Sequence, residues 1–201
     1  MRGALFLDRD GVLNVKAPEG AYVADRAGFQ LLPGVPEALA ALRVALPGLR
    51  IVVVTNQRGI ARGLLSAVTV DAIHGTMRAQ LAAAGGDLDA VLVCPHDLDE
   101  CDCRKPRPGL LLQALARFPD IDPRTSAMVG DSLSDLEAGH AIGAHLYLVG
   151  EPERRARVSR AAHERGLAID AEADSLPRLL DDGPLLGWLR HGATTLAGSM
   201  T

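Results

Sequence analysis

Two aspartates stand two positions apart directly after a short apolar run near the N-terminus, and their types and spacing suit phosphoryl chemistry. Asp8 and Asp10 flank Arg9, and Gly11 follows them. A glycine at this point lets the chain leave extended geometry, so that both carboxyl groups can face one reaction centre. One carboxylate could then attack a phosphorus atom while the other transfers protons. A pair of solvated turn residues is the alternative, and the rest of the sequence decides between the two.

Other polar residues could serve a phosphate ester at the same centre. A phosphate monoester is doubly negative, so attack by a carboxylate requires that this charge be neutralised. Asp131, with Asp8, offers the hard oxygen ligands that magnesium prefers. Lys105 offers a positive charge, and Thr55 and Asn56 offer a hydroxyl and amide donors to phosphoryl oxygens. Together these residues favour a magnesium-dependent phosphatase over a solvated turn.

The elements that must position these side chains follow from the apolar pattern of the chain. Apolar runs without polar alternation, separated by helical patterns, indicate a parallel sheet covered on both faces. The predicted fold class is therefore α/β, a doubly wound parallel sheet. Ligands of such sheets bind outside the carboxyl ends of the strands, where the residues above are found. We expect strands at Ala4–Leu7, Ile51–Thr55, Ala90–Cys94, Ala127–Gly130 and Leu146–Val149, and helices at Val35–Leu46, Ser66–Ala84, Pro108–Phe118, Ser132–Ile142, Pro152–Arg165 and Leu176–Leu180.

All three cysteines of the chain lie within ten residues, together with one histidine. Cys94, His96, Cys101 and Cys103 supply four soft or borderline ligands, which is enough for a closed tetrahedral zinc site. Reduced cysteines packed as small hydrophobic residues are the weaker alternative, because the segment is strongly acidic. A fully ligated ion has no open position for water, so we expect a structural zinc that orders the loop leading to Lys105.

Length and charge limit the partners of the protein. With 201 residues, a net charge of −4 and a pI near 5.8, the chain suits a single domain over residues 1–190 and does not suit a nucleic-acid or anionic-membrane partner. Four arginines near the C-terminus are helix-spaced and accompanied by glutamates, and we interpret them as a solvated helix face. These are Arg154, Arg155, Arg157 and Arg160.

The remaining expectations concern location and less regular segments. No apolar run reaches the length of a membrane span and no secretory signal is evident, so a cytoplasmic protein is expected. Without a coiled-coil pattern, a monomer is the expected state. The segment Val15–Phe29 is too polar and glycine-rich for a helix and is predicted to form a flap over the site. Residues 191–201 are small and polar, as in a disordered tail.

Four motifs resemble those of the haloacid dehalogenase superfamily of phosphatases, over roughly Ala4 to Val149. This resemblance implies a Rossmann-like fold without a large cap domain. It also implies that Asp8 is the nucleophile that forms an aspartyl phosphate and that Asp10 is the general acid and then the base. The matching stretches are Asp8-Arg9-Asp10-Gly11-Val12, Thr55-Asn56, Lys105 and Gly130-Asp131-x-x-x-Asp135.

The same resemblance assigns the remaining roles around the magnesium. It implies that the ion is held by Asp8, by the backbone carbonyl of Asp10 and by Asp131, with Asp135 as a supporting carboxylate. Thr55 and Lys105 complete the catalytic residues of the predicted site, which is written here in the numbering of this chain.

Two branches of the superfamily are similar to this chain: the heptose 1,7-bisphosphate phosphatases and the histidinol-phosphate phosphatases. The run from Thr55 to Gly63 and the run from Arg104 to Gly109 resemble the first, whereas the short span from His96 to Cys101 resembles the second. Loops vary easily, so the catalytic-face match carries more weight. The resemblance thus implies a phosphorylated sugar that loses its C7 phosphate. The substrate-binding residues it implies are Asn56, Gln57, Arg58, Arg104 and Ser132.

Two of these positions depart from the family pattern, and two non-enzymatic hypotheses remain to be weighed. Arg58 replaces a serine that is usual in the family, and Ser132 stands where a lysine often follows the acid. A receiver-type phosphoacceptor module shares the α/β fold and magnesium, but its acid lies on a middle strand without a partner like Asp10. A zinc-held interaction module with a dead site fits less well, because no core catalytic position is missing.

Overall fold

The computed structural model describes residues 2–18, 20–181, 183 and 185–187, and the tail expected at 191–201 lies outside them. Helices and strands alternate along the chain, and a short 3₁₀ helix spans Pro123–Thr125. The strands are β1 (Ala4–Leu7), β2 (Arg50–Asn56), β3 (Ala90–Cys94), β4 (Ala127–Gly130), β5 (His145–Val149) and β6 (Ala171–Ala173), and the helices are α1 (Val35–Ala45), α2 (Ala67–Ala83), α3 (Gly109–Arg117), α4 (Leu133–Ala141), α5 (Pro152–Glu164) and α6 (Leu176–Asp181).

The strands form one six-stranded sheet in the order β3-β2-β1-β4-β5-β6, and all neighbouring strands pair in parallel. The order reverses between β1 and β4, which pair through Leu5 with Ala127 and Leu7 with Val129. The chain connections leave β1 and β4 toward opposite sides, and this leaves a crevice at the carboxyl ends of these two strands. This confirms the predicted doubly wound α/β class.

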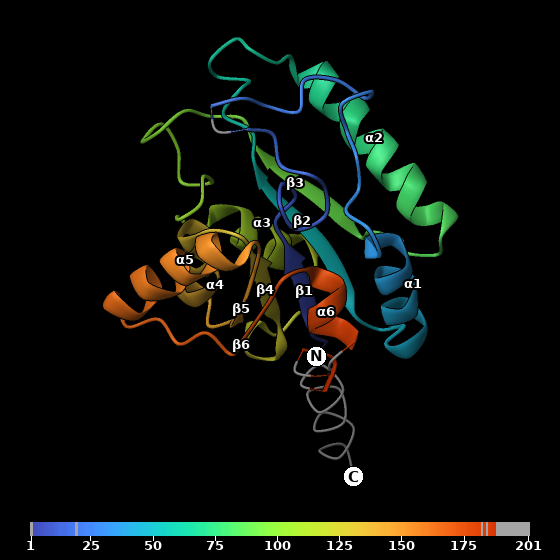
Figure 1. Ribbon diagram of the computed structural model, residues 1–201, viewed down its shortest axis with the longest axis vertical. Helices are drawn as coiled ribbons and strands as arrows, with labels where there is room; N and C mark the ends of the chain where they lie inside the picture. The colour runs from blue at the N-terminus through green and yellow to red at the C-terminus, as the bar shows by residue number, and fades with distance from the viewer. Residues whose placement is uncertain (1, 19, 182, 184, 188–201) are drawn as a thin grey trace.

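Helices cover both faces of the sheet, and each face has its own apolar core (Figure 1). Successive residues of a strand point to opposite faces, so β1 sends Leu5 and Leu7 into one core and Ala4 and Phe6 into the other. The first core is shared with α1, α2 and α6, and the second with α3, α4 and α5. All four side chains are fully buried, which fixes the position where β1 ends and its acids begin.

The sixth strand is the main element that the apolar pattern misses. β6 comprises only Ala171, Glu172 and Ala173, none of them buried, and it pairs with β5 at the edge of the sheet. A three-residue strand with a charged centre has no period that can be recognised in the sequence. The expected helices are all present, although their predicted end residues often prove to be caps, as Ser66 is for α2.

Two further observations concern the rest of the chain. None of the described residues between β1 and α1 lies in a helix, as expected for the flap. Within the part of the chain that the structure describes, no helix combines the length and apolar character needed to cross a bilayer.

Candidate active site

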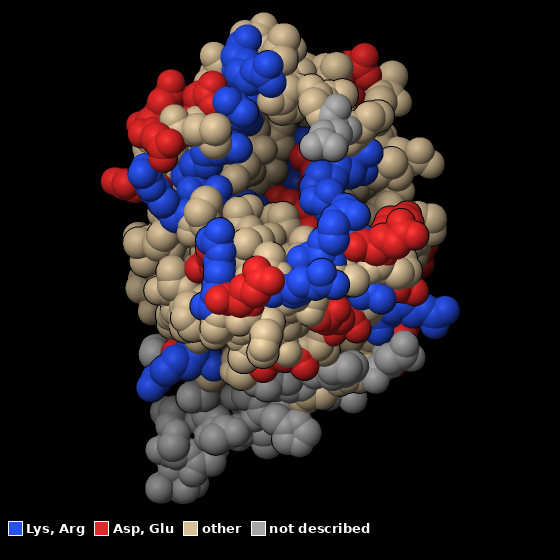
Figure 2. Space-filling model, turned by 60° about the vertical axis from the view of Figure 1, so that its left-hand side comes forward, with Lys and Arg blue, Asp and Glu red and all other residues tan. Residues whose placement is uncertain are grey.

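Several strand ends border one cavity of about 500 Å³ at the carboxyl edge of the sheet. β1 leads into Asp8, β2 contains Thr55 and β4 leads into Asp131, while Lys105 comes from the loop between β3 and α3. The flap contributes Lys16 and its neighbours to the lining. In Figure 2 a hollow with acidic side chains inside it is flanked by lysine and arginine side chains. The structure thus brings together the acids, hydroxyl and lysine that the sequence assigns to one centre.

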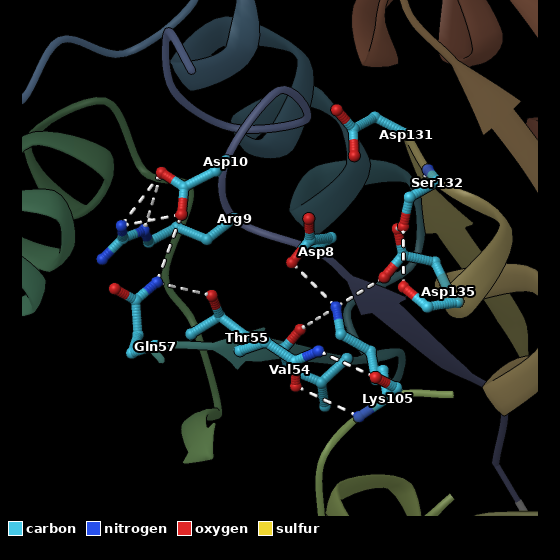
Figure 3. A network of polar contacts seen from close by, with 12 residues as sticks. Asp8, Arg9, Asp10, Val54, Thr55, Gln57, Lys105, Asp131, Ser132 and Asp135 are labelled. Atoms are coloured by element: carbon cyan, nitrogen blue, oxygen red, sulfur yellow. Dashed lines mark hydrogen bonds and ion pairs between the residues drawn. The ribbon is translucent and has the colours of Figure 1, made fainter. Parts of the chain in front are cut away.

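The ammonium group of Lys105 lies between two carboxylates (Figure 3). Its Nζ is 2.8 Å from Asp8 Oδ1 and 2.6 Å from Asp135 Oδ1, and it donates to the carbonyl of Val54 at 2.7 Å. Asn56 holds the same residue through its backbone, donating to the carbonyl of Lys105 at 3.0 Å and accepting from its N–H at 3.1 Å. Two hydrogen bonds and a second ion pair therefore hold the ammonium group in place.

Burial and neighbouring charges act on Asp8 in opposite directions. The net result is a pKa of about 7 for Asp8. Burial raises this pKa most, the charge of Lys105 lowers it, and the nearby carboxylates of Asp135, Asp131 and Asp10 raise it. Burial acts to lower the pKa of Lys105, but Asp135 and Asp8 together raise it above its ordinary value. Lys105 therefore stays charged, while Asp8 is balanced between its two forms near neutral pH. A further cation beside Asp8 would favour the carboxylate.

Asp10 is held in a separate set of hydrogen bonds. Arg9 Nη2 donates to both of its oxygens at 2.9 and 2.8 Å, Asn14 Nδ2 donates at 3.0 Å and Gln57 Nε2 at 3.2 Å. Burial acts to raise the pKa of Asp10, but the charge of Arg9 and these hydrogen bonds lower it overall. Gly11 has a φ of 90°, which allows the sharp turn after the acid. Asp10 is thus a carboxylate at neutral pH, the form of a base.

Behind this arginine lies a buried histidine from α2. Arg9 Nη1 and His74 Nε2 are 3.0 Å apart, and both side chains are buried. Since a guanidinium group can only donate, His74 Nε2 must accept, which makes the imidazole neutral with its proton on Nδ1. The pKa of His74 is lowered to about 4, first by burial and then by the charge of Arg9. The imidazole therefore helps to fix the arginine that holds Asp10.

Three carboxylates meet where a cation could be held. Oxygens of Asp8, Asp131 and Asp135 lie within 4.8 Å of one another. Asp131 Oδ1 is buried and accepts no hydrogen bond from any described residue, while its Oδ2 is 2.6 Å from Lys16 Nζ and 3.3 Å from Arg154 Nη2. Burial raises the pKa of Asp131 against the pull of Lys16. A buried carboxylate oxygen without a partner, beside two more carboxylates, suits a hard divalent cation such as magnesium.

The smaller polar residues at the strand ends support their neighbours. Thr55 Oγ1 accepts from Gln57 Nε2 at 2.9 Å. The Ser132 hydroxyl donates to Asp135 Oδ2 at 2.6 Å and its backbone N–H donates to the same oxygen at 3.1 Å, at the start of α4. Thr55 and Ser132 line the cavity, as Asn56 does, whereas Gln57 is buried beside it.

The two arginines expected to bind substrate lie elsewhere. Arg58 forms an ion pair with Asp97 in the loop after β3, and its guanidinium holds the pKa of Asp97 below its usual range. Arg104 is not among the cavity-lining residues, and its Nη1 is buried without a hydrogen-bond partner in the described part of the chain. Neither arginine is therefore among the residues that line the cavity.

The four expected zinc ligands converge in the loop after β3. Cys94 Sγ and Cys101 Sγ are 3.6 Å apart, Cys101 Sγ and Cys103 Sγ 3.2 Å, and His96 Nδ1 lies 3.3 Å from Cys103 Sγ and 3.8 Å from Cys94 Sγ. All four atoms lie within 4.8 Å of one another. Tetrahedral zinc with bonds of about 2.3 Å separates its sulfur ligands by about 3.8 Å, close to this spacing. The cluster therefore fits zinc in ligand type, number and separation.

Three cations of the cavity lining were not among the predicted site residues, and two of them lie on the helix face that was interpreted as solvated. Arg154 and Arg157 line the cavity with Lys16, although the sequence suggested a solvated helix face. The signal that could have found them is their place on the first two turns of α5, which begins just after the carboxyl end of β5. Arg155 is not among the cavity-lining residues and pairs with Asp174 at 2.6 Å, whereas Arg160 is exposed, as expected of a solvated face.

Comparisons with known proteins agree with this geometry. A family model described as HAD-hydrolase-like matches residues 102–176. The D-glycero-alpha-D-manno-heptose-1,7-bisphosphate 7-phosphatase of Mycobacterium tuberculosis is 52% identical over 141 residues, 70% of this chain and 73% of the relative. The D-glycero-beta-D-manno-heptose-1,7-bisphosphate 7-phosphatase of Pseudomonas putida is 40% identical over 167 residues, 83% of this chain and 93% of the relative.

A solved structure is similar over nearly the full length. The D,D-heptose 1,7-bisphosphate phosphatase from B. bronchiseptica, complexed with magnesium and phosphate, superposes with a TM-score of 0.73 at 32% identity. The match covers 98% of this chain and 99% of that one.

Proposed function

Since the chain belongs to the heptose-1,7-bisphosphate 7-phosphatase family of HAD-like hydrolases, a family of phosphomonoester hydrolases, we propose that it removes the C7 phosphate from D-glycero-D-manno-heptose 1,7-bisphosphate. One observation carries the proposal beyond the family relationship. Asp8 and Asp131 face each other across the β1–β4 switch point, with Lys105 fixed beside Asp8. This arrangement suits attack on a doubly negative phosphoryl group, because a nucleophilic carboxylate, cation ligands and a fixed positive charge are all in place.

In the first half of the reaction, a carboxylate oxygen of Asp8 attacks the phosphorus atom of the C7 phosphate. The P–O bond to the sugar breaks as the bond to Asp8 forms, and the sugar oxygen takes a proton from Asp10. In the second half, water attacks the phosphorus of the aspartyl phosphate, Asp10 accepts the proton of the water, and phosphate and free Asp8 are released. Lys105 offsets the charge at Asp8 throughout, and Thr55 and Asn56 are proposed to contact phosphoryl oxygens.

The low pKa of Asp10 suits the second half of this scheme directly. The first half requires a protonated Asp10. A dianionic phosphate entering the cavity beside this carboxylate would raise its pKa by repulsion, and so favour the acid form when substrate is bound. Arg9, Asn14 and Gln57 would keep the carboxyl group oriented in both forms.

Asp8, Asp131 and the backbone carbonyl of Asp10 are proposed to hold magnesium, with Asp135 in support through Lys105 and Ser132. When bound, the ion would neutralise charge on the phosphoryl oxygens.

Cys94, His96, Cys101 and Cys103 are proposed to hold one structural zinc ion. The thiols of this cluster also support the expectation of a reducing, cytoplasmic setting. Metal analysis of the purified protein should find one zinc per chain, and its removal by a chelator should lower the thermal midpoint. Protein that contains no zinc and whose three thiols all react with a thiol reagent would refute the site.

The substrate is tested by measuring phosphate release from a panel. The panel contains the α and β anomers of the heptose 1,7-bisphosphate, because relatives named for each anomer are similar to this chain, together with histidinol phosphate. We expect one of the bisphosphates to have the highest kcat/KM and the product to be the 1-phosphate. A preference for histidinol phosphate would overturn the substrate and leave the aspartyl-phosphate chemistry standing.

A further inference from the structure

The guanidinium group of Arg9 binds both oxygens of Asp10 and so fixes the plane of that carboxyl group (Figure 3). Arg9 Nη2 donates to Asp10 Oδ2 at 2.8 Å and to Oδ1 at 2.9 Å, and Arg9 Nε donates to Oδ1 at 3.3 Å. A group that transfers protons is effective only within hydrogen-bond reach of the atom it serves. The orientation of Asp10 therefore depends on what holds Arg9.

His74 binds the other side of this guanidinium group. Its Nε2 lies 3.0 Å from Arg9 Nη1, although the two residues are 65 positions apart in the chain. Arg9 is 1% exposed and His74 is 6% exposed. Arg9 and Asp10 are consecutive, so the bonds between them cannot fix either side chain relative to the rest of the protein. Among the residues that the structure describes, His74 is the one hydrogen-bond partner of the Arg9 side chain apart from Asp10.

The place of His74 is set by the packing of α2. Ile73 and Met77 are fully buried in the apolar core that α2 shares with α1 and α6, and Ser66 caps the start of the helix through its hydroxyl group. His74 is not among the described residues that line the cavity. It is therefore placed to act on Arg9 and not on a substrate.

We propose that His74 is a positioning residue for the proton transfers of Asp10, because its imidazole holds Arg9 in the orientation that directs the Asp10 carboxyl group. This inference rests on the proposed function, since it requires Asp10 to be the general acid and base. A guanidinium group only donates hydrogen bonds, so an apolar side chain at position 74 would leave a buried donor unpaired. Arg9 would then turn toward another acceptor and bind Asp10 less firmly.

An ester that needs no acid separates this role from general support of the fold. The sugar alkoxide is a poor leaving group, and it takes a proton from Asp10 as the P–O bond breaks. p-Nitrophenyl phosphate presents the same phosphoryl group to Asp8, but nitrophenolate leaves as a stable anion without that proton. The constant kcat/KM covers the steps up to departure of the leaving group, so the later attack of water does not enter it.

Each protein is described by the ratio of kcat/KM on the heptose 1,7-bisphosphate to kcat/KM on p-nitrophenyl phosphate. His74→Leu should lower this ratio roughly 10- to 100-fold, the loss expected for a misaligned acid, and should change kcat/KM on p-nitrophenyl phosphate by less than about twofold. His74→Gln should restore most of the ratio, because its amide oxygen can accept from Arg9. Ile73→Val is the matched control: it removes one methylene of the core from the same helix, and its ratio should equal that of the wild type.

Loss by the same factor on both esters in His74→Leu would overturn the inference, because damage to the fold or to Asp8 slows both reactions alike. Asp10→Asn is measured in parallel and should lower the ratio at least as far. A wild-type ratio in Asp10→Asn would contradict the proposed role of Asp10 itself. A low ratio in Asp10→Asn beside a wild-type ratio in His74→Leu would remove only the role of His74. The two failures are therefore distinguishable. If histidinol phosphate proves to be the better substrate, it takes the place of the bisphosphate, since its leaving oxygen is also an alkoxide.

Discussion

The proposed chemistry depends on Asp8. Its environment should allow a variant that loses activity and keeps the fold. Asp8→Asn keeps the shape of the side chain and removes the nucleophilic carboxylate. Turnover should fall by roughly 10³-fold or more. The fold should persist, because burial raises the pKa of Asp8 to about 7 and the site therefore already tolerates a neutral group at neutral pH.

Phosphate release and urea denaturation at pH 7 check these two expectations together. The control is Asp71→Asn on the exposed side of α2, which makes the same chemical change away from the cavity. Substantial activity in purified Asp8→Asn protein, with the substitution verified by mass spectrometry, would contradict the assignment of Asp8 as the nucleophile.

His74 makes a prediction about stability and pH. Its pKa is about 4 in the folded protein, because burial and the charges of Arg9 and Arg78 disfavour the imidazolium more than Asp10 favours it. In the unfolded chain an ordinary histidine has a pKa of about 6.5. Between these values the unfolded state binds more protons, so this residue makes the protein less stable as the pH falls from about 6.5 toward 4.

The loss attributable to His74 should reach about 3 kcal/mol at the acid end of that range. His74→Gln can still accept a hydrogen bond from Arg9 but cannot titrate there. Free energies of unfolding from urea denaturation at pH 7 and pH 5 should therefore differ less in the variant than in the wild type. Equal differences in the two proteins would show that the imidazole is not kept neutral in the fold.

The residues at strand ends could be predicted from the sequence, and those that act through others could not. Asp8, Asp131 and Lys105 follow apolar runs or belong to spaced motifs, so their convergence follows from the geometry of a parallel sheet. His74 lies in the middle of a helix, and nothing in the sequence brings it to Arg9. The buried partners of Asn56 likewise depend on how the loop before Lys105 folds back.

The junction between β4 and α4 is the element that carries two of the site's acids, and it depends on a glycine. A Cβ added at Gly130 would lie 2.1 Å from the Cβ of Asp135, which no real contact allows. Gly130→Ala should therefore push the first turn of α4 away from the sheet, destabilise the protein by about 2 kcal/mol or more and reduce activity by displacing Asp135 from Lys105.

Gly75→Ala provides the comparison within a helix. Nothing lies within 4 Å of the added Cβ, so this variant should gain roughly 0.5–1 kcal/mol from the higher helix propensity of alanine. Thermal or urea unfolding of both variants measures the effects. Equal stabilities would mean that α4 can shift freely and that Gly130 is not required by close packing.

Among the elements, the sequence predicts the buried strands better than the exposed strand at the edge of the sheet. Five strands have apolar runs that mark them within a residue or so, because both faces of the sheet are covered and their side chains are buried. β6 is short and exposed, and it forms because β5 offers an unpaired edge after α5 turns the chain back. A tertiary partner decides that strand, and the local residues do not.

The protein as a whole is negatively charged, whereas one part of the cavity lining carries positive charges. The chain has a net charge of −4, yet Lys16, Arg154 and Arg157 line the entrance to a site proposed for a highly anionic substrate. Local potentials in a cleft govern the approach of a ligand more than net charge does. The approach of a bisphosphate should therefore be favoured by these cations and opposed weakly by the rest of the surface.

This balance predicts a salt dependence that grows with the charge of the substrate. The Debye length falls from about 10 Å at 0.1 M salt to about 3 Å at 1 M, so added sodium chloride screens the rim from the substrate. At saturating magnesium, raising the salt over that range should lower kcat/KM for the heptose 1,7-bisphosphate several-fold, and by clearly less for the 7-phosphate. Arg157→Glu should flatten the dependence for the bisphosphate, whereas Arg160→Gln should keep it. Identical salt slopes for the two substrates would mean that Lys16, Arg154 and Arg157 do not attract the second phosphate, since the effect of salt on magnesium and on Asp8 is common to both reactions.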